Sequence, residues 1–118
     1  MVQIKRAYSQ PIPNDGVRIL VDRVWPRGCT KEHLQLDAWR KDLAPSTALR
    51  KWFGHDPRKW VEFSVRYRKE LQQPELRSAI DELAKLARTQ RITLVYSAKN
   101  TTQNQAVILK ELIEGAGG

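Results

Sequence analysis

The stretch VRILVDRV, residues 17–24, is almost continuously apolar and rich in β-branched residues. A run of this kind is typical of a strand that is covered on both faces of a sheet. A second such run, RITLVYS, follows at 91–97, and a weaker alternating segment, VQIKRA, stands at 2–7. Pro26 ends the first run, because proline removes a ladder donor and restricts the residue before it. The sequence therefore predicts three strands, and it leaves open a short helix or strand around Leu36 to Leu43.

Helical patterns fill the sequence between the two long strands. Ser46 is a good N-cap for a first helix, Gly54 closes it, and Asp56 with Pro57 begins a second one. Pro74 opens a third helix. The second helix carries its apolar residues at offsets of three and four, and these residues are Trp60, Phe63, Tyr67 and Leu71. A final helix is predicted over 102–114.

This order of elements predicts an α/β fold in one compact domain, residues 1–118, with a small, mostly parallel sheet flanked by helices. The strands at 17–24 and 91–97 are separated by helices, so they are expected to be parallel neighbours. Sheets of this kind bind ligands beyond the carboxyl ends of their strands. The segments 22–28 and 96–104 both follow such ends, and we expect them to share one edge of the sheet.

Composition narrows the classes of function. The 118 residues are 41% hydrophobic and 29% charged, which is typical of a soluble globular protein. Neither a membrane-length apolar run nor a signal-peptide pattern is found, and a lone cysteine fits a reducing compartment, so we expect a cytoplasmic protein without a membrane partner. The net charge of +8 attracts anions. A small anionic ligand and nucleic acid are both compatible with it.

Two residues are candidates for proton transfer. Asp22 lies on a strand face where an apolar residue is expected, so its carboxylate must be paired or hydrogen-bonded, with Arg6, Arg27 or backbone amides as partners. It is either a structural ion-pair partner or a general base. His55 precedes a helix start beside Asp56, and it is either structural or an acid–base group.

The two strand ends also carry residues suited to anion binding. Arginine matches phosphate or carboxylate geometry, and a helix N-terminus attracts anions. Two simpler interpretations remain open, namely cation–π contacts of the arginines with tryptophans and helix capping by Asn100. The predicted ligand-binding residues are Arg23, Trp25, Arg27, Ser97, Lys99, Asn100 and Asn104.

No cofactor or metal is expected from these patterns. The chain has no Gly-rich loop of the phosphate- or dinucleotide-binding kind. Cys29 and His33 are four residues apart, but two ligands do not make a metal site.

Four segments together resemble the YeaO-like proteins, a family known as a domain of unknown function, DUF 488. These segments, which cover almost the whole chain in order, are DGVRILVDRVWPRG, LDAWRKDLAPSTALRKWFGHDP, FSVRYRKEL and TLVYSAKNTTQNQAVILKE. The resemblance implies a compact cytoplasmic α/β protein and supplies no activity. Resembling proteins commonly carry a histidine in the turn before the last helix, whereas positions 103–105 here are Gln, Asn and Gln.

The function predicted from these observations is binding of a small phosphate- or nucleotide-like anion at 22–28 and 96–104, with enzymatic activity left open. The alternative is a nucleic-acid-binding module that uses the basic surface, whose affinity would fall steeply with salt. Oligomeric state is not predicted.

Overall fold

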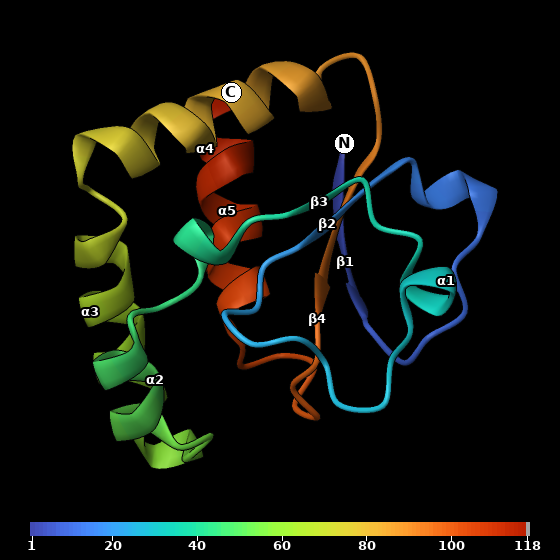
Figure 1. Cartoon of the computed structure of the whole chain (residues 1–118). Helices are drawn as coiled ribbons and strands as arrows, with labels where there is room; N and C mark the ends of the chain where they lie inside the picture. The colour runs from blue at the N-terminus through green and yellow to red at the C-terminus, as the bar shows by residue number, and fades with distance from the viewer. Residues whose placement is uncertain (118) are drawn as a thin grey trace.

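The computed structural model describes residues 1–117, and its centre is one four-stranded parallel sheet with the order β1-β4-β2-β3 (Figure 1). The central strand β4 pairs with β1 from Val2↔Ile92 onward and with β2 from Val17↔Ile92 onward. The α/β class and the parallel pairing of the two long strands are thus confirmed. The strands are β1 (Val2–Arg6), β2 (Val17–Leu20), β3 (Ala38–Trp39) and β4 (Ile92–Tyr96).

The strand predicted at 17–24 is shorter than expected and ends at Leu20. The Val21 amide still donates to Val95 O at 3.0 Å, but β4 itself ends at Tyr96. The next amide of that chain, Ser97 N, donates to the Asp22 side chain instead of to main chain. Asp22 therefore terminates the pairing by replacing a backbone acceptor with its carboxylate.

Helices cover both faces of the sheet. Helices α2, α3, α4 and α5 form the layer on one side, and α1 lies on the other side of the strands (Figure 1). All five residues of β4 are buried, as expected for a strand covered on both faces. The α-helices are α1 (Lys31–Leu34), α2 (Thr47–Phe53), α3 (Trp60–Glu70), α4 (Pro74–Ala87) and α5 (Gln105–Gly117), with 3-10 turns at Pro13–Asp15, Lys41–Leu43 and Pro57–Lys59.

The helix boundaries follow capping residues. The Ser46 hydroxyl accepts from the Leu49 amide at 3.1 Å and begins α2, and Gly54 ends it in the left-handed conformation with φ 52°. The start predicted at 102 for the last helix is wrong, because α5 begins at Gln105. Asn104 is its cap, since the Asn104 Oδ1 accepts from the amides of residues 106 and 107 at 2.9 and 3.2 Å.

A buried charged cluster joins the first turn to the sheet. Asp15 and Arg18 are 1% and 3% exposed, and Arg18 NH1 donates to Asp15 Oδ2 at 2.7 Å. Lys5 Nζ reaches Asp15 Oδ1 at 3.1 Å. No local pattern in the sequence indicated this cluster.

Candidate functional site

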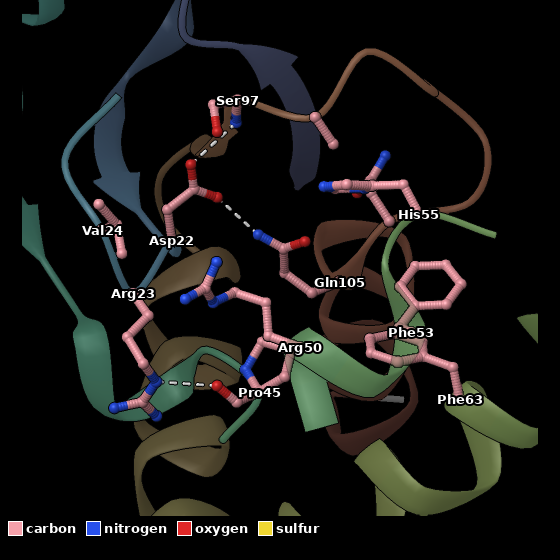
Figure 2. Close-up of a pocket in the computed structure, with 12 residues that line it drawn as sticks. Asp22, Arg23, Val24, Pro45, Arg50, Phe53, His55, Phe63, Ser97 and Gln105 are labelled. Atoms are coloured by element: carbon pink, nitrogen blue, oxygen red, sulfur yellow. Dashed lines mark hydrogen bonds between the residues drawn. The ribbon is translucent and has the colours of Figure 1, made fainter. Parts of the chain in front are cut away.

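A pocket of about 120 Å³ lies at the carboxyl edge of the sheet (Figure 2). The ends of β2 and β4 form one side of it, and the C-terminal part of α2 with the following loop forms the other. Phe53 and Phe63 stack at 4.2 Å between ring centroids and supply an apolar wall. The parallel sheet brings the two strand ends together here, as the pattern of strands predicted.

Asp22 is the most buried charged group of the pocket, with 7% exposure. Its Oδ2 accepts from the Ser97 amide at 3.0 Å, and its Oδ1 accepts from Gln105 Nε2 at 2.6 Å. Burial raises the pKa of Asp22 above its ordinary value, although the hydrogen bonds from Ser97 and Gln105 and the positive charge of His55 oppose this rise. The carboxylate thus links the ends of two strands to the first residue of α5.

Three basic side chains line the same pocket, and they differ in how they are held. Arg23 Nε donates to Pro45 O at 2.8 Å, so its guanidinium is anchored to main chain. The Arg50 side chain extends from α2 toward the space between Asp22 and Arg23 (Figure 2). Among the described residues, no hydrogen bond or ion pair engages the Arg50 guanidinium, which leaves it available to an anion.

His55 reaches the pocket through an uncommon backbone conformation. Gly54 and His55 are consecutive residues with φ of 52° and 58°, in the left-handed region. A non-glycine residue in this region is uncommon, and such conformations concentrate at functional sites. The exposed imidazole lies beside Phe53, with 6.0 Å between the ring centroids.

The structure brings five of the predicted site residues to this pocket, namely Asp22, Arg23, His55, Ser97 and Asn104. For Asn104, however, both side-chain groups have structural partners. Its Nδ2 donates to Asn100 O at 2.9 Å while its Oδ1 caps α5. Asp22 is not paired with either arginine predicted for it, and its partners are a backbone amide and Gln105.

The other four predicted residues, Trp25, Arg27, Lys99 and Asn100, do not line this pocket. Lys99 and Arg27 are exposed. Asn100 organises its own loop, where its Oδ1 accepts from the Gln103 amide at 3.0 Å. The helix capping that was left open for Asn100 is therefore not found, because its side chain holds the loop before α5 and Asn104 caps the helix.

Trp25 lies on the opposite side of segment 22–28, in a small aromatic cluster. Its Nε1 donates to Cys29 O at 2.7 Å, and its ring meets that of Trp39 edge-on at 5.3 Å. Trp39 Nε1 in turn donates to Asp22 O at 2.7 Å, which holds the segment in place behind the pocket. Burial raises the pKa of the Cys29 thiol, so a structural role suits this cysteine better than a reactive one.

Two pocket residues were missed by the sequence analysis, Arg50 and Gln105. A signal for Arg50 existed, because it stands four residues before Gly54 and hence on the helix face that leads to His55. No comparable signal existed for Gln105. Its contact with Asp22 depends on where α5 begins, and that boundary was predicted three residues too early.

Two other kinds of site are not found within residues 1–117. No group of three or more His, Cys, Asp or Glu side chains in this part of the chain is placed to hold a metal ion. None of its helices has the length and apolar character needed to span a bilayer.

Three basic side chains on α3 and in the turn before it, part of the basic surface that the nucleic-acid alternative requires, make internal contacts. Lys59 Nζ donates to Trp52 O at 2.9 Å, and the Arg66 guanidinium lies 4.4 Å from the centre of the Trp52 ring. Arg68 forms an ion pair with Glu111 on α5. These cations are therefore less available to phosphates than their number in the sequence suggests.

Comparison with known proteins gives a consistent assignment. Residues 1–117 match the family profile described as the inactive DUF488-N3 subclade. The uncharacterized protein YeaO of Escherichia coli K12 is 47% identical over 110 residues, which are 93% of this chain and 94% of that protein. Uncharacterized proteins of Mycobacterium bovis and Mycobacterium tuberculosis are 38% identical over 114 residues, 97% of this chain and 94% of theirs. No solved structure matches the chain significantly.

Proposed function

Since this chain belongs to the YeaO-like DUF488 family, we propose that it binds a small anionic, phosphate-like ligand in the pocket that contains Asp22. The description of its subclade as inactive favours binding over catalysis. Asp22 and His55, the residues predicted for proton transfer, then serve to orient the ligand.

The observation that carries this proposal is the state of the Arg50 guanidinium. It lines the pocket and has no protein partner among the described residues, while Arg23 adds a second positive charge nearby. Arginine presents a planar fork of donors that matches phosphate and carboxylate oxygens. A second guanidinium next to the open one favours an anion over a neutral or cationic ligand.

The size of the pocket limits the ligand. Pockets that enclose drug-sized molecules usually measure about 300–1,000 Å³, whereas this one measures about 120 Å³. A phosphate group with a few attached atoms fits this volume. A whole nucleotide does not, so a nucleotide would have to leave its base outside, against the rim formed by Val24, which is 58% exposed.

A thermal-shift series tests the proposal with inorganic phosphate, sulfate and small phosphate monoesters at low and high salt. A ligand at about 100 times its Kd adds about 2.7 kcal/mol and raises the melting temperature by several degrees. We expect Arg50→Ala to abolish the shift. Arg77→Ala removes the same charge from an exposed position on α4 that does not line this pocket, and it should keep the shift.

The outcomes separate the two candidate functions. If no small anion stabilises the protein, or if R50A and R77A respond alike, the pocket is not the binding site. If a short oligonucleotide alone stabilises it, and salt removes the effect, the nucleic-acid function replaces this one.

A further inference from the structure

The pocket combines two charges of opposite sign that do not neutralise each other. Asp22 and Arg50 line the same cavity, yet no ion pair joins them within residues 1–117. A ligand located between them meets a guanidinium on one side and a carboxylate on the other. An anion without any hydrogen-bond donor would satisfy Arg50 but would be repelled by Asp22.

The depth of the charged groups orients such a ligand. Asp22 is 7% exposed and forms the floor, whereas Arg50 and His55 are exposed at the mouth. The ligand's anionic group therefore meets the Arg50 guanidinium at the exposed side, and its other end points inward to the carboxylate. That inner end must carry a donor, because both oxygens of Asp22 keep free lone pairs beyond the two bonds from Ser97 and Gln105.

We infer that the ligand is a small hydroxylated anion whose hydroxyl group donates to Asp22 while its phosphate or carboxylate group binds Arg50. This inference rests on the proposed function and narrows its ligand class. Unsubstituted alkyl phosphates in their dianionic form are poor ligands, because they leave the Asp22 carboxylate desolvated without a new donor. Asp22 is thus the specificity-determining residue and Arg50 the anion-binding residue.

Calorimetric titration of the full chain with two matched compounds tests this inference. Glycerol 1-phosphate and propyl phosphate share three carbons and a phosphate monoester, and only the first bears hydroxyl groups. A hydrogen bond to a charged group contributes enough to change affinity about tenfold or more. We expect glycerol 1-phosphate to bind at least about tenfold more tightly. Glycerate and propionate repeat the comparison with a carboxylate as the anion.

Two variants assign the effect to residues. Asp22→Asn should weaken the binding of glycerol 1-phosphate, because it removes the negative charge that accepts the ligand's hydroxyl group. It should strengthen the binding of propyl phosphate, because it also removes the repulsion between Asp22 and the phosphate. Arg50→Ala should weaken both compounds by similar factors, and Arg77→Ala should change neither. A merely structural role for Asp22 would instead lower both affinities alike.

The outcomes distinguish anion binding by the pocket from the preference for a hydroxylated anion. Equal affinity of the two phosphates for the wild-type chain, with loss of both in R50A, overturns the hydroxylated ligand and leaves anion binding standing. No binding of any of the four compounds overturns both. The wild-type comparison needs no variant, so the test holds even if D22N does not fold.

Discussion

Replacement of Asp15 by asparagine tests the buried charged cluster at the first turn. The carboxylate is 1% exposed and accepts hydrogen bonds from four residues. Its Oδ2 accepts from Arg18 NH1 at 2.7 Å and from the Ile12 amide at 3.1 Å. Its Oδ1 accepts from Lys5 Nζ and Gln3 Nε2, both at 3.1 Å. All four acceptor positions of the carboxylate are therefore used.

The cost of D15N follows from what remains behind. Asparagine keeps the shape, but it removes the negative charge and turns one acceptor into a donor that faces N–H groups. Arg18 stays buried with its charge uncompensated, and removing one partner of such a pair costs about 3–5 kcal/mol. That is a large fraction of the 5–15 kcal/mol that separates folded from unfolded domains. The melting temperature should fall by about 10–20 °C for a domain of this size.

Urea unfolding followed by tryptophan fluorescence measures this loss. Asp42→Asn is the matched control, because its pair with Arg40 is solvent-exposed and should contribute less than about 1 kcal/mol. If D15N and D42N lower the free energy of unfolding by similar amounts, the cluster does not have the role argued from its burial.

The same cluster predicts a dependence on pH. Burial by itself would raise the pKa of Asp15, but the Ile12 amide, Lys5 and Arg18 together lower it. An acid with a lowered pKa in the folded state stabilises the fold above its unfolded pKa, and this stabilisation is lost as pH falls further. The wild-type chain should thus lose stability below about pH 4. D15N should lack that part of the loss, and a parallel decline in both chains would contradict the assignment.

Three further changes have expected effects on the free energy of unfolding, each measurable by urea titration. Gly16 has φ 66°, and Gly16→Ala places a Cβ 2.2 Å from a carbonyl oxygen, so it should cost about 3 kcal/mol or more. Gly28 has φ 79° but faces open space, so Gly28→Ala should cost about 1 kcal/mol. Burial raises the pKa of Asp22, so ionisation of its carboxyl group opposes folding as pH rises. The free energy of unfolding of D22N should therefore improve relative to that of the wild-type chain from pH 4 to pH 7. A difference between the two chains that does not change with pH would contradict this. Ser46→Ala removes the cap of α2 and should cost about 1 kcal/mol, while Thr47→Ala should stay within about 0.5 kcal/mol.

Local signals in the sequence predicted most of the fold correctly. The apolar runs identified β2 and β4, and their separation by helices identified them as parallel neighbours. Ser46 and Gly54 marked the two ends of α2, since capping depends on residues close in sequence. The start of the last helix was misplaced because Asn100 and Asn104 both suit a cap, and packing selected the second.

The site could be predicted only in part. Asp22 could be predicted as a candidate, because the sequence alone shows a carboxylate at a position in a strand where a buried apolar residue is expected. Its partners were not predictable, because the Gln105 contact joins residues 83 positions apart and depends on the depth of α5. For the same reason Lys99 and Arg27 were predicted beside the strand ends, whereas Arg50 from a distant helix supplies the open guanidinium.

The sequence by itself thus determined strands β1, β2 and β4, the caps of α2 and the presence of a polar edge, because apolar periodicity and capping act over a few residues. Only the tertiary structure decided which charged side chains lie close together at that edge of the sheet. Such meetings depend on the packing of helices far apart in the chain, and a shift of one helical turn would exchange Gln105 for another residue. Asp22 illustrates both cases, since its buried position could be predicted from the sequence and its hydrogen-bond partners could not.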